Sequence, residues 1–159
     1  MKINLVRNGI FPITKSVSGE VVFNTAMTGY PESLTDPSYK GQILVATYPL
    51  IGNYGVPGKK TDRNLLKHFE SDKIAVTAFI VSEYTDEFSH WNAEESLNDW
   101  MMKNKIPGIH GIDTRALTKV LRESGTMLGK IIINEEDSDG FIVIAEFVKV
   151  IEPSIMSIE

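Results

Sequence analysis

Apolar runs of strand length recur along the chain and predict a sheet. Residues 42–50 and 73–84 carry apolar side chains at successive positions, which is typical of strands buried on both faces. Shorter apolar runs predict strands at residues 20–24 and 126–134. The last run, residues 141–151, fits a strand or a helix equally well, because its pattern does not separate the two.

The first residues predict a hairpin at the edge of this sheet. Residues 3–13 read as two short strands around Asn8-Gly9, a dipeptide that favours a tight turn. Pro12 has no backbone N–H to donate to a neighbouring strand. The second strand of the hairpin is therefore restricted to an edge.

Two helices have clear start and stop signals. Residues 92–105 begin with Asn92 as the expected N-cap and carry Glu95 three residues later, which resembles a capping box. Residues 113–125 begin with Asp113 as the N-cap and close with Gly125. The apolar positions expected to share a face are Leu97, Trp100 and Met101 in the first helix and Ala116, Leu117, Val120 and Leu121 in the second.

Two shorter segments also favour helix. Residues 62–70 place Leu65, Leu66 and Phe69 on one side of a short helix. Residues 30–34 fit a single helical turn, which the following Asp36-Pro37 would stop.

This mixture of strands and helices predicts the α/β fold class. We expect one domain over residues 1–159, with a mixed central sheet covered by helices and a smaller antiparallel sheet. No internal repeat or low-complexity linker divides the chain.

Composition limits the classes of partner that the protein can bind and the cellular location that we expect for it. The chain has 159 residues, of which 42% are hydrophobic and 23% charged, as in an ordinary soluble domain. Its net charge of −5 argues against binding to nucleic acid or to an anionic membrane surface. No segment resembles a signal peptide or approaches the roughly 18 apolar residues of a membrane span. We therefore expect a cytoplasmic protein.

Cysteine is absent from the chain. Disulfides, thiolate metal sites and a thiol nucleophile are thereby excluded. His68, His90 and His110 lie far apart and match no metal-ligand spacing, so the sequence predicts no metal site.

A hydrolase triad is a hypothesis suggested by Asp86, Ser89 and His90. Adjacent residues in a chain usually point apart, and no G-x-S-x-G elbow occurs. A small hydrolase around His90 therefore stands only as a rival reading.

The glycine-rich stretch "GNYGVPGKKTD" has the look of a phosphate cradle. Gly52, Gly55 and Gly58 do not have the G-x-x-x-x-G-K-[ST] spacing, and Pro57 removes an amide donor. The stretch is interpreted as an ordinary loop.

Two long polar loops, residues 24–41 and 49–58, remain as candidate binding surfaces. Both loops fall largely within one long segment, "GEVVFNTAMTGYPESLTDPSYKGQILVATYPLIGNYGV". This segment resembles the signature of the small chain of glutamine-hydrolysing carbamoyl phosphate synthetase. "IPGIHGIDTRALTKVLRESGTMLGKI" resembles a second stretch of the same family, and the two together cover residues 19–133. The resemblance is to the N-terminal domain of that small chain.

The resemblance implies a three-layer β/β/α swivelling fold that packs against a large synthetase chain. It also implies a second small-chain domain, an amidotransferase with a cysteine nucleophile and a His-Glu pair. That domain releases ammonia from glutamine, and the large chain uses ammonia, bicarbonate and ATP to make carbamoyl phosphate for arginine and pyrimidine biosynthesis.

Specific residues follow from the resemblance. Ser38 of the D-P-S motif matches a serine that contributes to the family's glutamine site, although a local turn hydroxyl is the competing interpretation. Asp36 and Thr35 are expected to pin the turn. The resemblance also places a subunit interface at Asn24, Thr25, Met27, Thr28, Gly29 and Tyr30.

The missing cysteine limits what this chain does alone. By the family mechanism it cannot hydrolyse glutamine, and ATP and metal are expected on the large chain, with no cofactor here. The expected partners are the large chain and an amidotransferase domain. Exposed apolar surface could also drive self-association.

The ends of the chain depart from the family pattern. Arg7-Asn8-Gly9 and Pro12 stand where an acidic hairpin is usual, and residues 139–159 do not resemble the usual linker. The sequence leaves open a truncated product, an isolated domain or a degenerate copy. A free-standing protein-binding module that no longer serves a synthetase is the alternative function.

Overall fold

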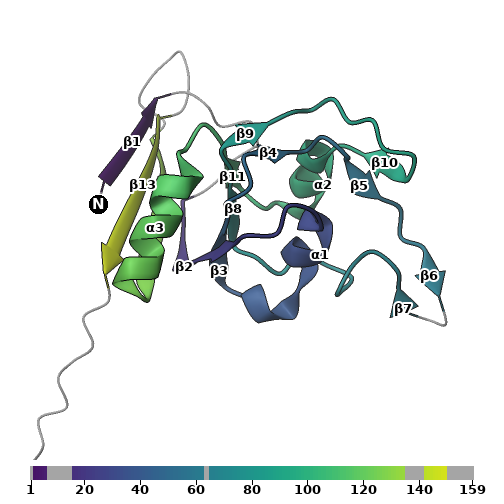
Figure 1. Cartoon of the computed structure of the whole chain (residues 1–159), viewed down its shortest axis with the longest axis horizontal. Coiled ribbons are helices and arrows are strands. Elements are labelled where there is room, and N and C mark those ends of the chain that lie inside the picture. Colours follow the sequence, from purple (N-terminus) through teal and green to yellow (C-terminus); the bar gives the residue numbers. More distant parts are fainter. Residues whose placement is uncertain (1, 7–15, 63–64, 135–141, 150–159) are drawn as a thin grey trace, which may run out of the picture.

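Four segments of the chain, residues 2–6, 16–62, 65–134 and 142–149, are described by the computed structural model (Figure 1). The helices are α1 (Tyr30–Thr35), the 3-10 turn η1 (Pro37–Tyr39), α2 (Leu97–Asn104) and α3 (Thr114–Ser124). The strands are β1 (Lys2–Val6), β2 (Val17–Asn24), β3 (Gln42–Ala46), β4 (Leu50–Ile51), β5 (Val56–Pro57), β6 (Thr61–Asp62), β7 (Leu65–Leu66), β8 (Ala78–Ile80), β9 (Glu83–Tyr84), β10 (Ala93–Glu95), β11 (Gly108–Ile109), β12 (Met127–Asn134) and β13 (Ile142–Lys149).

A mixed sheet forms the centre of the fold, in the order β1-β13-β12-β2-β3-β8-β11. The strands from β2 to β11 run parallel to one another, whereas β12 is antiparallel to β2 and β13 is antiparallel to β12. Short strand pairs, β5 with β10, β4 with β9 and β6 with β7, lie beside it. The α/β class, the mixed central sheet and the smaller antiparallel pairing are thereby confirmed.

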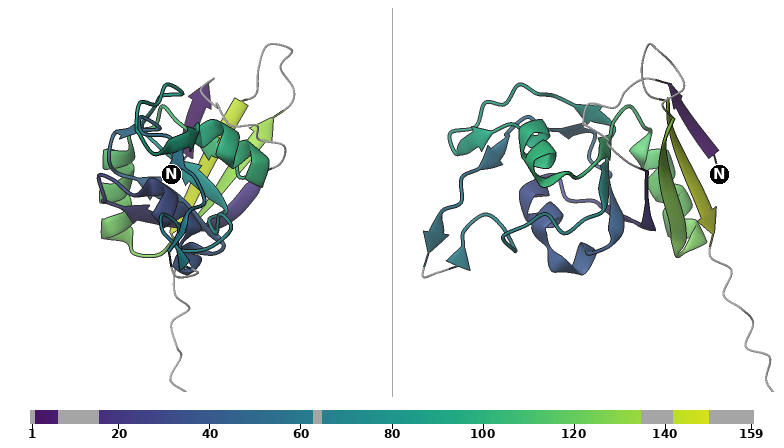
Figure 2. Two further views of the ribbon diagram at one scale, coloured as in Figure 1. Left: turned by 90° about the vertical axis from the view of Figure 1, so that its right-hand side faces the viewer. Right: turned by 180° about the vertical axis from the view of Figure 1, so that it is seen from behind.

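Alternation along β3 explains why both faces of this sheet are buried. Ile43 and Val45 pack in a cluster with Leu117 and Leu121 of α3. Leu44 and Ala46 pack on the other face, in a cluster that includes residues of α1 and α2. Figure 2 shows α3 and α2 on opposite sides of the sheet. An apolar run without polar interruptions is what a strand covered on both faces requires.

The helix at Thr114–Ser124 has the caps that the sequence predicts. Asp113 accepts a hydrogen bond from the Ala116 amide at 2.9 Å, and Gly125 follows the last turn with a φ of 73°. Ala116, expected on the apolar face, is instead exposed, and Thr114 is buried in its place. The face toward the sheet is thus rotated slightly from the predicted one.

The start of α2 differs from the prediction. Residues 93–95 form strand β10, and the N-cap is Ser96, whose hydroxyl accepts a hydrogen bond from the Asp99 amide at 3.1 Å. Asn92 is wrong as the cap because its buried side chain bonds His68 at 3.1 Å. Tertiary contacts therefore take this side chain away from the helix.

The short helix predicted at residues 62–70 is wrong. Thr61–Asp62 and Leu65–Leu66 pair as antiparallel strands at the end of the molecule far from β1 and β13 (Figure 1). Phe69 is still buried, with its ring 5.6 Å from Trp100. A single short helix has little intrinsic stability, and the extended chain buries Phe69 without one.

Two predictions concern the ends of the chain, and the structure tests one of them. The run left open between strand and helix is strand β13, which pairs with both β12 and β1. The second strand of the predicted hairpin around Asn8-Gly9 lies outside the described residues.

Candidate functional site

The expected interface segment, Asn24 to Tyr30, connects the end of β2 to the start of α1. Thr25, Met27 and Thr28 are exposed, and Met27 keeps 68% of its surface accessible. Tyr30 is buried at 5%. The segment therefore has one anchored end and an outward face.

Asn24 fixes the beginning of this segment with both atoms of its amide. Its Oδ1 accepts from the Ala26 amide at 2.7 Å, and its Nδ2 donates to the Ser33 hydroxyl at 2.9 Å. Its carbonyl accepts from the Thr47 amide at 2.9 Å. Such bonds from a side chain to nearby backbone hold a turn in one conformation.

Tyr54, from the second loop, fixes the other end. Its ring stacks on Tyr30 with centroids 4.4 Å apart, and its hydroxyl accepts from the Gly29 amide at 2.7 Å. The Tyr30 hydroxyl in turn donates to the Gly55 carbonyl at 2.5 Å. Burial raises the pKa of both tyrosines above its usual value. Both hydroxyls therefore stay protonated at neutral pH and keep these bonds.

The sequence identified the loop at 49–58 as a candidate surface but not Tyr54 as its key residue. A tyrosine beside three glycines carries no signal of its partner, because the partner lies on a different loop. The stacking with Tyr30 could be found only from the fold.

A small cavity opens beneath the segment. Its volume is about 20 Å³, which is room for a water-sized group, and not for a substrate. Its lining includes Asn24, Met27, Thr28, Tyr30, Ser33 and Tyr54. The segment therefore offers an outward surface, and the cavity behind it is too small for catalysis on a metabolite.

Ser38 lies in the exposed 3-10 turn η1, close to Asp36. Both its amide, at 2.8 Å, and its hydroxyl donate to the Asp36 Oδ1. The hydrogen bonds from Ser38 hold the pKa of the Asp36 carboxyl below its usual range. Since the hydroxyl hydrogen is directed to Asp36, the Ser38 oxygen is left to accept a hydrogen bond from a ligand.

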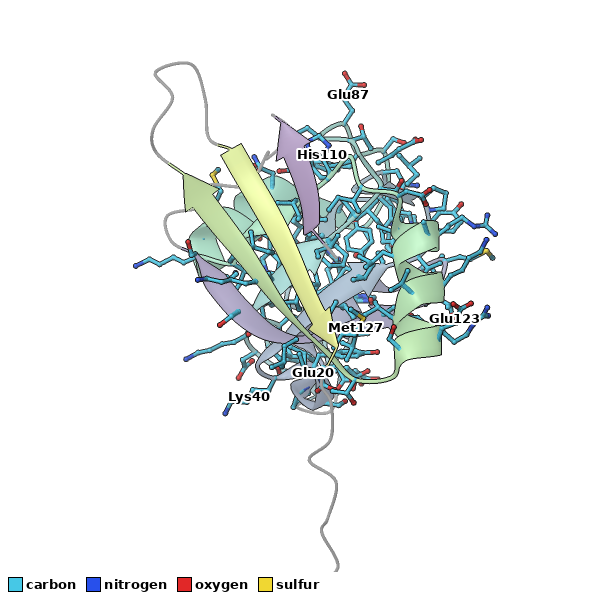
Figure 3. The ribbon with its side chains drawn as sticks, turned by 90° about the vertical axis from the view of Figure 1, so that its left-hand side faces the viewer. Glu20, Lys40, Glu87, His110, Glu123 and Met127 are labelled. Carbon is cyan, nitrogen blue, oxygen red and sulfur yellow. The ribbon has the colours of Figure 1, made fainter. Side chains whose placement is uncertain are left out.

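The structure does not bring Ser38 and the interface segment together. Strands β2 and β3 are parallel, with Asn24 paired to Ala46 at their carboxyl ends. The interface segment follows that end of β2, whereas Ser38 precedes the other end of β3. The two sites therefore lie at opposite ends of these strands. Figure 3 shows Glu20 and Lys40 at one end of the molecule and Glu87 and His110 at the other.

Asp86, Ser89 and His90 do not form a triad in the described part of the chain. Asp86 accepts from the Tyr84 hydroxyl. The His90 ring lies between Tyr54 at 6.1 Å and Trp91 at 5.6 Å. The geometry therefore contains no base positioned to activate Ser89.

The glycine loop is a tight turn rather than a phosphate cradle. Gly52 and Gly55 adopt positive φ angles, and the Gly55 amide donates to the Gly52 carbonyl at 2.9 Å. The Glu94 carboxylate lies directly against Gly58. A phosphate at this position would meet a negative charge, which excludes it.

Neither metal nor membrane features occur in the described ranges. No group of three or more acidic or histidine side chains within them could hold a metal ion. None of their helices is long and apolar enough to cross a membrane.

Comparisons with known proteins give a consistent result. The family model of the carbamoyl-phosphate synthase small chain, CPSase domain, matches residues 4–131. The arginine-specific small chain of carbamoyl phosphate synthase from Eremothecium gossypii is 58% identical over 118 residues, which are 73% of this chain and 30% of that protein. Its counterpart from Saccharomyces cerevisiae is 54% identical over 129 residues, 80% of this chain and 31% of that protein.

A much longer relative shows the same similarity. The multifunctional protein pyrABCN of Emericella nidulans is 54% identical over 132 residues, which are 80% of this chain and 6% of that protein. The chain thus spans less than a third of the length of the relatives that it matches.

Proposed function

The chain belongs to the family of carbamoyl-phosphate synthase small chains, and on that premise we propose that it is a non-catalytic docking and site-lining domain. It supports glutamine hydrolysis by an amidotransferase domain and the delivery of ammonia to a large chain. That large chain carries ATP and metal and makes carbamoyl phosphate for arginine and pyrimidine biosynthesis.

The observation that carries the docking role is the combination of exposure and rigidity at residues 25–28. Their side chains are exposed, yet hydrogen bonds from the Ala26 and Gly29 amides to the side chains of Asn24 and Tyr54 fix the backbone at both ends. A surface that is ordered before it binds loses less conformational entropy on association. This is what a docking surface needs and what an ordinary solvent loop does not.

A site-lining role for Ser38 has support in its chemistry. The Ser38 hydroxyl donates to Asp36, so that its oxygen can accept a hydrogen bond from a ligand, and the adjacent Asp36 is negative at neutral pH. Glutamine carries a cationic α-amino group, which both features would attract. We therefore assign Ser38 and Asp36 to the amino end of glutamine, at the face where an amidotransferase domain docks.

Association with the large chain tests the docking role. The chain is titrated with the large chain from the same source in low salt, by native mass spectrometry and calorimetry. A one-to-one complex is expected. Absence of association would instead favour the free-standing binding module and would refute the docking role.

A further inference from the structure

A row of aromatic rings continues outward from the interface segment. Tyr54 stacks on Tyr30, the His90 ring lies 6.1 Å from Tyr54, and the Trp91 ring lies 5.6 Å from His90. Phe88 lies against Gly55. We define the aromatic patch as Tyr54, Phe88, His90 and Trp91.

Trp91 is the most exposed large hydrophobic side chain within the described residues. It keeps 85% of its surface accessible, and Phe88 keeps 37%. The backbone beneath them is ordered, because the Ser89 amide donates to the Asn53 carbonyl and the Ala93 amide to the His90 carbonyl. Tryptophan and tyrosine are the side chains most enriched at the energetic centres of protein interfaces.

The chain segment that carries Phe88, His90 and Trp91 is acidic. No Lys or Arg occurs between Lys73 and Lys103, and this stretch carries six carboxylates, Glu83, Asp86, Glu87, Glu94, Glu95 and Asp99. Glu95 is paired with Lys103, whereas Glu87 projects outward from the molecule (Figure 3). Lys60 lies nearby, with its ammonium group 3.4 Å from the side-chain oxygen of Asn92.

We infer that the aromatic patch is a second docking contact, which inserts Trp91 into an apolar pocket rimmed by Lys and Arg on the large chain. The inference rests on the proposed function and adds to it the residues of contact and the charge of the partner surface. Charge complementarity selects this occupant. The carboxylates of this acidic segment repel nucleic acid phosphates and anionic lipids, and they repel a second copy of the same patch.

Continuity supports a single partner for the segment and the patch. Met27 of the interface segment and Tyr54 of the patch line the same small cavity, so the two surfaces adjoin. The interface segment, which the patch adjoins, lies at the opposite end of the parallel strands from Ser38. One body can therefore cover the segment and the patch together while a different body covers Ser38.

Calorimetric titration of the large chain with variants of this chain tests the inference. Trp91→Ser is expected to weaken association at least tenfold, and Glu87→Lys about threefold to tenfold at low salt. Leu128→Ser is the matched control, because Leu128 is 53% exposed on β12, away from the patch. It should change the affinity less than twofold. Urea unfolding of each variant establishes that it is folded.

Hydrogen exchange of the complex distinguishes direct contact from an indirect effect. Amides of residues 86–93 should gain protection when the large chain binds. If the wild-type chain binds but Trp91→Ser binds equally well and residues 86–93 gain no protection, this inference is overturned and the proposed function stands. If the wild-type chain does not bind at all, the proposed function falls, and this inference falls with it.

Discussion

At the scale of single residues, the chemistry of Ser38 depends on its neighbour. Its hydroxyl hydrogen is directed to Asp36, so in this turn the Ser38 oxygen is an acceptor, and not a donor, toward a ligand. The D-P-S motif identified the residue by resemblance, but the direction of its hydrogen bond required the structure. Together, Ser38 and Asp36 present two acceptors and a negative charge.

Removal of the Ser38 hydroxyl should weaken the use of glutamine selectively. In an intact two-domain small chain bound to its large chain, Ser38→Ala should raise the KM for glutamine about twofold to tenfold, which corresponds to one lost hydrogen bond. Synthesis from free ammonia should be unchanged. Ser124→Ala, at the end of α3, serves as the control, and equal loss with both nitrogen sources would contradict the assignment.

Tyr30 has a structural role that can be measured without a partner. Tyr30→Phe leaves the buried Gly55 carbonyl without its hydrogen-bond donor and should lower the free energy of unfolding by about 1–3 kcal/mol. Tyr39→Phe is the matched control for the loss of a hydroxyl from a partly buried ring. Urea unfolding measures both, and similar values for the two variants would show that the Gly55 contact is weak.

The same residue predicts how stability depends on pH. Burial raises the pKa of Tyr30 above its ordinary value of 10.0, so above pH 10 the unfolded chain loses a proton that the folded chain keeps. The stabilisation is complete below pH 10 and is lost as the pH rises, by up to about 1.4 kcal/mol per pH unit. The urea concentration at the midpoint of unfolding should fall less steeply with pH, between pH 8 and 11, in Tyr30→Phe than in the wild-type chain. Parallel curves would contradict this.

At the scale of elements, the loop at 49–58 determines the shape of the interface segment. Gly55 has a φ of 61°, and a Cβ built on it would lie 2.9 Å from the Glu95 carbonyl. Gly55 also supplies the carbonyl that holds Tyr30. Through these contacts of Gly55, the loop packs between the end of β10 and the start of α1 and holds them together.

Substitution of Gly55, compared with that of Gly41, should distinguish the cost of a steric clash from the cost of backbone strain in the free energy of unfolding. Gly55→Ala and Gly41→Ala both place a side chain at positive φ, but nothing lies within 4 Å of a Cβ at Gly41. Gly55→Ala should cost about 1–3 kcal/mol more in the free energy of unfolding than Gly41→Ala. Chemical denaturation of the pair measures the difference, and equal costs would mean that the loop relaxes freely.

The two longer helices show when sequence pattern alone is sufficient to predict the ends of a helix. The α3 helix was predicted with its caps, because Asp113 and Gly125 act on the backbone next to them. The N-cap of α2 was misplaced, because Asn92 has a long-range partner in His68. Local signals are reliable only when no distant residue competes for the same side chain.

At the scale of the whole molecule, charge and exposed apolar surface act in opposite directions. The net charge of −5 repels a second copy, whereas Met27, Trp91 and Leu128 would be buried by association. Salt screens the repulsion, and it also screens attraction to a basic partner. The two kinds of association should therefore respond to salt with opposite signs.

Sedimentation at several protein concentrations measures this response. Self-association of the chain should increase between 50 mM and 500 mM salt, at which the Debye length falls from roughly 14 Å to 4 Å. Affinity for the large chain should decrease over the same range. Self-association that weakens with salt would mean that specific ion pairs, rather than apolar contact, join the copies.

The sequence by itself determined the fold class, the buried strands, the capped helix α3 and the family, because these depend on local pattern or on long motifs read in order. Only the tertiary structure decided that Tyr54 holds the interface segment, that Ser38 lies at the other end of the strands, and that the aromatic patch adjoins the interface segment. Each of these facts joins residues far apart in the chain. Apolar periodicity states which side chains are buried, but not which distant neighbours they meet.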